Sequence, residues 1–316
     1  TWAKDSTDSS ITINFQRTQQ AFDNPLVYYD KQPRHGDLTR YEFRSNAHLK
    51  QSPSLQRSVA VAQLDNLQPA TTYYFVVGDR QTGFSAEQRF KTLPGGSAPL
   101  HFVVGGDTGA SAQTRAIFRT AARTNPDFVV LGGDLVYGPK PEDFPKWDEW
   151  LKIYTEEMKG TDGRLIPLVV ALGNHDVDRS LYAVRAHYFQ FLFEQTELSY
   201  FTRHFGAHTA IHVLDSGHIA AVDGDQSDWL SETLADNGVQ KNKIAVYHVP
   251  LYPAAGDYYA RDPQREREVW EPLFDRYGLD LAFEHHNHLL KRTKKIFSGI
   301  ESYDDRGTIY LGGGCF

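Results

Sequence analysis

The sequence has little of what a disulfide-stabilised scaffold, a membrane protein or a nucleic-acid-binding protein would need. It contains one cysteine, Cys315, which excludes a disulfide within the chain but does not decide the cellular compartment. It has no run of 18 or more apolar residues, so no membrane-spanning helix is predicted. The formal net charge of −7 argues against a nucleic-acid-binding surface, and the basic run Lys291–Lys295 is interpreted as a solvated edge.

What is present is the composition of an ordinary globular protein. With 316 residues, of which 40% are hydrophobic and 23% charged, the chain is long enough for two domains and a large core. Residues 1–92 are predicted to form an all-β sandwich, because Ile11, Ile13 and Phe15 alternate with polar residues at the period of a half-buried strand. The segment Leu67–Tyr73 precedes another alternating run and resembles the tyrosine corner of a fibronectin type III domain.

Residues 93–99 are predicted to be a linker, and residues 100–316 an α/β domain. In the second domain apolar runs alternate with helical patterns, as in parallel βαβ units. We expect, for example, a helix over Ser111–Arg123 with Ser111 as its cap. The strand pattern Thr308–Leu311 lies so close to Phe316 that we expect the natural chain to continue, and this domain to be truncated at its C-terminus.

Five short polar clusters each follow, or lie beside, an apolar run that is typical of a β-strand. They are Gly106-Asp107-Thr108-Gly109, Gly133-Asp134-Leu135-Val136-Tyr137, Gly173-Asn174-His175-Asp176, Tyr247-His248-Val249-Pro250 and His286-Asn287-His288. Open α/β sheets place functional residues just beyond the carboxyl ends of their strands, so these clusters are expected at one edge. A turn or a packed histidine explains any single cluster, but not ligand-type side chains at all five.

The donor atoms in these clusters divide into two chemical kinds. Asp107, Asp134 and an ionised Tyr137 are hard oxygen donors, which together with a histidine suit a trivalent ion such as Fe(III). Asn174, His248 and a second histidine are neutral donors, and a site that combines them with a shared Asp134 suits Zn, Mn or Fe(II). One shared carboxylate sets two ions about 3.5–4 Å apart, the spacing of two-metal hydrolysis. The sequence therefore predicts a site for two metal ions.

In their order, the five clusters resemble those of the purple acid phosphatases, within the calcineurin-like metallophosphoesterase superfamily. The resemblance covers nearly the whole chain, and Tyr137 is the discriminating residue, because most of the superfamily lacks a tyrosine at this position. It implies an α/β metallophosphoesterase domain built as a layered αββα sandwich. The ligands that it implies for the ferric ion are Asp107, Asp134, Tyr137 and His288. Those that it implies for the divalent ion are Asp134, Asn174, His248 and His286.

The sequence departs from this family in two places. The family usually has Gly-His-x-His in the last cluster, whereas His285 stands at the glycine position here. In an extended segment its side chain would point away from those of His286 and His288, and we interpret it as structural. Larger plant members also have histidines shortly beyond the fourth cluster, which this chain lacks, and Tyr258 or Arg261 is our candidate for the missing substrate contact.

The predicted function is hydrolysis of phosphate monoesters by a dinuclear-metal phosphatase that resembles the purple acid phosphatases. The resemblance implies attack by a metal-bound hydroxide, with Asn174 and His175 contacting the substrate. His175 is the predicted catalytic residue, which stabilises the phosphoryl oxygens or protonates the leaving group. A metal-dependent phosphodiesterase or nucleotide pyrophosphatase is the alternative, since the shape of the pocket decides between them. A non-catalytic binding protein is disfavoured, because every ligand and His175 are present.

The predicted cofactors are Fe(III) and a divalent Fe, Zn or Mn ion. The predicted partner is a small phosphorylated substrate, with no nucleic acid and no membrane span, and the sequence does not indicate an oligomeric state. The chain begins at Thr1 without a charged and then apolar leader, which fits either a removed signal peptide or a shortened chain. We expect a secreted, periplasmic or cell-surface protein.

Overall fold

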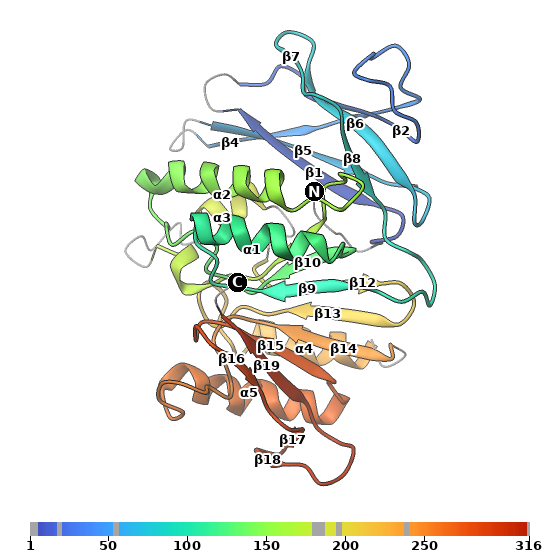
Figure 1. The fold of residues 1–316 in the computed structure, drawn as a ribbon. Coiled ribbons are helices and arrows are strands. Elements are labelled where there is room, and N and C mark those ends of the chain that lie inside the picture. Colours follow the sequence, from blue (N-terminus) through green and yellow to red (C-terminus); the bar gives the residue numbers. More distant parts are fainter. Residues whose placement is uncertain are drawn as a thin grey trace.

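The computed structural model describes residues 6–17, 21–52, 57–178, 187–193, 198–236 and 240–314. The last two residues, Cys315 and Phe316, on which the expectation of a truncated C-terminus bears, lie outside these ranges. Figure 1 shows a β-rich N-terminal part above a part in which helices cover sheets on both sides. No helix in the described part of the chain is long and apolar enough to cross a membrane.

The N-terminal part consists of two antiparallel sheets. The first has the order β1 (Ile11–Arg17), β5 (Arg57–Leu64), β4 (His48–Ser52). The second has the order β3 (Phe43–Asn46), β2 (Leu26–Asp30), β6 (Thr72–Asp79), β7 (Gly83–Phe84), and β8 (Gln88–Lys91) also pairs with β6. Residues of both sheets share one core, which includes Ile11, Ile13, Val27 and Phe75. The prediction of an all-β N-terminal part is therefore confirmed.

Tyr73 closes the turn that leads into β6. Its hydroxyl accepts a hydrogen bond of 2.9 Å from the backbone N–H of Gln68, and its ring is buried. This bond back to the chain a few residues upstream is the one that defines a tyrosine corner. The fibronectin type III topology and the boundaries at 92 and 99 stay predictions.

The second part contains two sheets of mainly parallel strands. The smaller one has the order β11 (Leu168–Val170), β10 (Phe128–Leu131), β9 (Phe102–Gly105). The larger one has the order β12 (Phe201–Phe205), β13 (Thr209–Val213), β14 (Asn242–Val246), β15 (Leu281–Glu284), β19 (Ile309–Gly313), β16 (Leu290–Arg292). Its four inner strands are parallel, and β12 and β16 are antiparallel edges. A small hairpin pairs β17 (Ile296–Phe297) with β18 (Ile300–Glu301).

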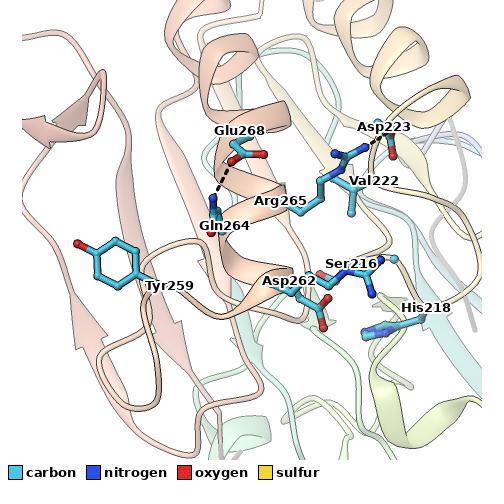
Figure 2. Close-up of a pocket in the computed structure, with 11 residues that line it drawn as sticks. Ser216, His218, Val222, Asp223, Tyr259, Asp262, Gln264, Arg265 and Glu268 are labelled. Carbon is cyan, nitrogen blue, oxygen red and sulfur yellow. Dashed lines mark hydrogen bonds and ion pairs between the residues drawn. The ribbon is translucent and has the colours of Figure 1, made fainter.

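The helices are α1 (Ala112–Arg123), α2 (Phe144–Glu157), α3 (His187–Leu192), α4 (Asp225–Asp236) and α5 (Arg261–Tyr277), with the short 3-10 turns η2 (Pro141–Asp143) and η3 (Asn174–Asp176). As predicted, Ser111 caps α1, because its hydroxyl accepts from the backbone N–H of Thr114 at 3.1 Å. The first turn of α5 and the loop after β13 border a cavity, which Figure 2 shows.

Alternate residues of each inner strand face opposite sides, which builds four layers. Val129 and Leu131 of β10 share a core with residues of α1 and α2, whereas Val130 between them belongs to the core shared by the two sheets. In the larger sheet, Ala245 of β14 shares a core with residues of α4 and α5. The order of helices, sheet, sheet and helices confirms the layered αββα prediction (Figure 1).

Helix α2 also joins the two parts of the chain. Val59 and Val61 of β5 belong to the same core as Trp150, and Arg57 forms an ion pair of 2.5 Å with Asp148. The parallel strands of the second part direct their carboxyl ends to an edge where an isolated bridge, Gly106 to Gly314, connects the two sheets. All five polar clusters lie just beyond strand ends of these two sheets.

Candidate metal centre

Three of the predicted ligands form an oxygen-rich group. The hydroxyl oxygen of Tyr137 lies 2.9 Å from Nε2 of His288 and 3.5 Å from Oδ1 of Asp107. The same Nε2 of His288 lies 3.2 Å from Oδ1 of Asp107. Two of these three donors are oxygens, and a carboxylate and a phenol side by side can supply the negative charge that a hard trivalent ion requires.

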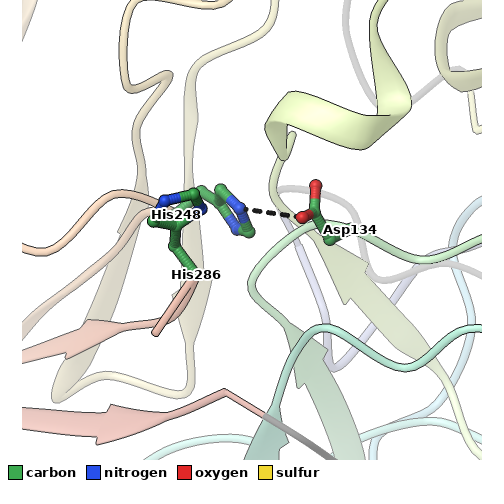
Figure 3. Close-up of side chains that lie close together, drawn as sticks. All are labelled: Asp134, His248 and His286. Atoms are coloured by element: carbon green, nitrogen blue, oxygen red, sulfur yellow. Dashed lines mark ion pairs between the residues drawn. The ribbon is translucent and has the colours of Figure 1, made fainter. Parts of the chain in front are cut away.

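The other predicted ligands form a second group around His248. Its Nε2 lies 3.0 Å from Oδ1 of Asn174 and 3.2 Å from Oδ2 of Asp134. Ligand atoms of Asp134, His248 and His286 all lie within 4.8 Å of one another, and Figure 3 shows their side chains converging from separate loops. One carboxylate, one amide oxygen and two imidazoles are the donors that a divalent transition ion prefers.

The backbone that carries these ligands is unusual. Asp107, Asp134, Tyr137 and His286 have φ angles of 55°, 53°, 57° and 63°, in the left-handed region. This region costs an ordinary L-residue about 1–3 kcal/mol, and it is found mainly where the surrounding structure holds a functional side chain in place. The expectation of an extended segment around His285, His286 and His288 is wrong, because His286 is left-handed. Left-handed His286 turns the chain, so that the two histidines join different groups.

Backbone hydrogen bonds hold the left-handed loops together. The N–H of Asp107 donates to the carbonyl of Gly133 at 2.9 Å, and the N–H of Thr108 donates to the carbonyl of Asp134 at 3.1 Å. The N–H of His286 donates to Oδ2 of Asp107 at 3.1 Å. These hydrogen bonds connect the loops after β9, β10 and β15 to one another without the help of a metal ion.

The tautomer of His248 is set by the backbone. Its Nδ1 lies 2.9 Å from the carbonyl oxygen of Gly132, and a carbonyl can only accept, so Nδ1 carries a hydrogen. Nε2 therefore faces Asp134 and Asn174 as the atom that can bind an ion. A carbonyl that orients the ring of a ligand in this way is a common feature of metal sites.

The ionisable groups of the centre stabilise positive charge. Burial opposes ionisation of Asp134, but the hydrogen bond and charge of His248 and the hydrogen bond from the backbone of His175 together outweigh it and lower the pKa of Asp134. Burial also opposes a charge on His248, but its hydrogen bond to Asp134 and the negative charges of Asp134 and Asp107 together raise its pKa to about 9. Burial raises the pKa of Asp107. The carboxylates thus stabilise a cation at this position, which is the electrostatic condition for binding a metal ion.

Asp176 is a buried residue to which sequence reasoning assigned no role. Its carboxylate accepts from the backbone N–H groups of Asp134 at 2.8 Å, Leu135 at 3.0 Å and Gly173 at 2.9 Å. Burial, reinforced by the charge of Asp134, raises the pKa of Asp176 to about 7. The residue joins the loops after β10 and β11, and its place directly after His175 in the third cluster was the available sequence signal.

His175 lies at the exposed side of the centre. Its backbone N–H donates to Oδ1 of Asp134 at 2.7 Å, and its ring lies 4.7 Å from that of Tyr137 between centroids. The imidazole itself is exposed, unlike the buried ring of His248. Because it is exposed, the His175 imidazole can form a hydrogen bond with a molecule that binds at both ligand groups.

A cavity of about 880 Å³ lies next to the second group (Figure 2). One wall includes His218, whose ring is 5.8 Å from that of His248 between centroids. The other wall is the start of α5, with Arg261 and the exposed aromatic Tyr259. Arg261 has no ion-pair partner within 4.0 Å among the described residues, so its charge is available to a ligand.

The two candidates for the substrate contact differ in their surroundings. Arg261 lines the cavity, whereas Tyr258 does not belong to its lining. The ring of Tyr258 instead packs on the guanidinium of Arg267, 3.7 Å from the ring centroid, and 5.1 Å from the ring of Tyr259. Cation–π packing explains Tyr258 without a substrate.

Sequence comparison identifies the family. The calcineurin-like phosphoesterase profile matches residues 75–289, about two thirds of the chain, and the purple acid phosphatase N-terminal domain matches residues 1–92. The chain belongs to the calcineurin-like phosphoesterase family. The N-terminal match places the chain with the purple acid phosphatases, as its five clusters predict. Membership implies a dinuclear metal site, and the two ligand groups provide donors for it.

Several relatives of this chain are plant purple acid phosphatases. Purple acid phosphatase 15 of Arabidopsis thaliana is 26% identical over 285 residues, which cover 79% of this chain and 52% of the relative. Purple acid phosphatase 23 of the same plant is 25% identical over 284 residues, which cover 78% of this chain and 60% of the relative. The chain thus spans between half and two thirds of the length of these relatives.

Solved structures share the fold. The purple acid phosphatase PPD1 from yellow lupin (Lupinus luteus) seeds matches with a TM-score of 0.79 and 19% identity, over 98% of this chain and 63% of that one. The structure of PhoD matches with a TM-score of 0.71 and 14% identity, over 99% of this chain and 76% of that one. At these identities the likeness supports the two-part architecture and the layered fold alone.

Proposed function

We propose that this chain hydrolyses phosphate monoesters at a dinuclear metal centre. The observation that carries the proposal is that two ligand groups, one of Asp107, Tyr137 and His288 and one around His248 with Asp134, are joined by His175, whose backbone N–H bonds to Asp134 and whose exposed ring packs on Tyr137. The relatives named as purple acid phosphatases support it. So does the onion (Allium cepa) phosphoenolpyruvate phosphatase, which is 25% identical over 250 residues and carries a monoester substrate in its name.

The proposed metal ions are Fe(III) and a divalent Fe, Zn or Mn ion. The ligands proposed for the ferric ion are Asp107, Asp134, Tyr137 and His288. Those proposed for the divalent ion are Asp134, Asn174, His248 and His286. When bound, such a pair supplies Lewis-acid polarisation of the phosphate oxygens and an acidified water molecule.

The side chains of this chain then position the phosphate and move a proton. Oδ1 of Asn174 faces His248, so the amide nitrogen of Asn174 is left to donate to a phosphate oxygen. The exposed imidazole of His175 donates to a phosphoryl oxygen, or gives its proton to the oxygen of the leaving alcohol as the P–O bond breaks. No serine or cysteine nucleophile is needed for this chemistry.

The leaving group is proposed to lie in the cavity beside His218. Arg261, at the start of α5, would be its cationic contact, and Tyr258 is the weaker candidate because its ring already packs on Arg267. The partner is therefore a small phosphorylated molecule. A secreted, periplasmic or cell-surface location stays a prediction.

The function is tested by measuring the release of phosphate from an aryl phosphate monoester and of the phenol from the matching diester. The metal-loaded protein is expected to prefer the monoester, with an optimum below pH 7, because a ferric ion acidifies bound water more than a divalent ion does. Chelation should remove the activity, and adding back metal should restore it. Preference for the diester or for a dinucleotide pyrophosphate would favour the alternative function, and no turnover after metal loading would exclude a phosphoesterase.

Tyr137→Phe tests the ferric site by colour. A phenolate bound to Fe(III) transfers charge to the metal under visible light, so the oxidised, iron-loaded protein is expected to be violet to pink. The variant keeps the ring but loses the oxygen 2.9 Å from His288, and the absorption should vanish while the group around His248 still binds a divalent ion. Tyr252→Phe removes a hydroxyl that contacts Glu271 and should keep the colour. A colourless wild type would show that Tyr137 is not a ligand.

A further inference from the structure

His285 lies directly behind the centre, between the ends of the two sheets. Its side chain is 2% exposed, and its Nδ1 lies 3.2 Å from the carbonyl oxygen of Gly313 at the end of β19. Its backbone N–H donates to the carbonyl of His248 at 3.0 Å. Its Nε2 has no hydrogen-bond partner among the described residues, so the ring is held there mainly by its shape.

Two glycines make room for this ring. A Cβ atom added to Gly132 would lie 1.7 Å from Cδ2 of His285, and its three nearest neighbours are all atoms of that ring. A Cβ atom added to Gly106 would lie 2.7 Å from Nδ1 of His285, and its three nearest neighbours are again side-chain atoms of His285, two of them in the ring. The imidazole therefore occupies the space that a side chain at either position would need.

Each glycine is connected to one of the two ligand groups. The carbonyl of Gly132 accepts from Nδ1 of His248 and so orients the ring of that ligand. Gly106 directly precedes Asp107, the carboxylate of the oxygen-rich group. His285 thus touches the backbone that orients a ligand on each side of the centre, although it is not itself within either ligand group.

We propose that His285 is a positioning residue of the metal centre, which sets the separation of the two ligand groups by filling the space between Gly106 and Gly132. This inference rests on the proposed dinuclear site. The ring and the two glycines pack as one unit. A large side chain at position 285 fits only if positions 106 and 132 have no side chain. Loss of the ring would let the loops before Asp107 and Asp134 shift, which would change the spacing of the donor atoms that would hold the two ions.

The proposal is tested with His285→Ala, Gly132→Ala and the double variant. Each single variant is expected to weaken metal binding by about 10–100-fold, the usual effect of changing a group that orients ligands. The methyl group of Gly132→Ala enters the space that His285→Ala vacates, so the double variant should bind metal more tightly than either single variant. The readouts are Zn²⁺ titration of the metal-free protein and the visible band of the iron-loaded protein.

His212→Ala is the matched control. His212 is also a fully buried, neutral imidazole, for which burial lowers the pKa to about 3, but its Nδ1 pairs with Thr202 between β12 and β13. The control should lower the melting temperature and leave Zn²⁺ affinity and the visible band unchanged. Should His285→Ala not fold, His285→Asn keeps an N–H donor for Gly313, removes volume, and should change metal binding in the same direction.

Two results would overturn the positioning role. One is a His285 variant that loses stability as His212→Ala does but binds metal like the wild type. The other is a double variant whose loss of affinity equals the product of the two single losses, because independent sites add in free energy. Failure of the proposed function is recognised separately, as a wild-type protein that loads two ions but hydrolyses no phosphate ester.

Discussion

Asp134→Asn and Asp134→Ala are expected to lose bound metal and phosphatase activity together, while the protein remains folded. Asp134 belongs to the group around His248, with Oδ2 3.2 Å from His248 and Oδ1 2.7 Å from the backbone nitrogen of His175, and it is almost completely buried. If its carboxylate bridges both ions, its removal weakens both sites at once. Since a metal ion contributes several kcal/mol to a transition state, the rate should fall on the order of 10³-fold or more.

The measurement combines metal content after dialysis, turnover of a monoester and circular dichroism. Asp79→Asn is a matched control, because Asp79 is also a buried aspartate but pairs with Arg17 in the N-terminal sandwich. This control should keep its metal and its activity. An Asp134 variant that retains two ions and near-normal turnover would exclude a bridging role.

His175→Ala is expected to keep both metal ions and to lose about 10²–10⁴ in rate, the usual contribution of a positioned acid or base. The side chain is exposed and packs on the ring of Tyr137 without reaching a donor atom that an ion needs, and the backbone N–H that holds Asp134 survives the substitution. Metal analysis and steady-state kinetics measure the two effects separately. Loss of metal together with the rate would show that His175 acts as a ligand.

The dependence on the leaving group separates the two proposed roles of His175. A group that protonates the leaving oxygen matters most for alkyl phosphates, whose alcohols are poor leaving groups, and least for activated aryl phosphates. If His175→Ala slows alkyl phosphates far more than aryl phosphates, the residue is the general acid. An equal loss for both classes indicates stabilisation of the phosphoryl oxygens instead.

Tertiary structure decided which candidates share a group. Tyr137 and His288 are 151 positions apart in the chain, and they meet because the loops after β10 and β15 reach the same edge of two stacked sheets. The family resemblance already assigned His286 and His288 to different ions, but their spacing alone fits an extended segment and gives no reason for the separation. Their separation follows from the left-handed backbone of His286, which the bond from its N–H to Asp107 holds in place.

Tertiary structure also decided the roles of the residues that surround the ligands. Asp176 accepts hydrogen bonds from three N–H groups of two loops, and the ring of His285 fits between glycines that follow β9 and β10, so the partners of both residues lie far from them in the chain. Arg261 and Tyr258, which are equal candidates by sequence, differ only because the turn into α5 directs one to the cavity and the other onto Arg267.

The sequence by itself determined the chemistry of this protein: the donor types, their places after apolar strands, the all-β N-terminal part and the capped helix at Ser111. These features can be predicted because the spacing of buried residues, the residues of a turn and the type of ligand side chain are properties of short segments. Only the tertiary structure decided how the donors combine, which ring fills the space behind them and which cation faces the cavity. Those outcomes depend on strand order and on contacts between residues far apart in the chain, and no local pattern records them.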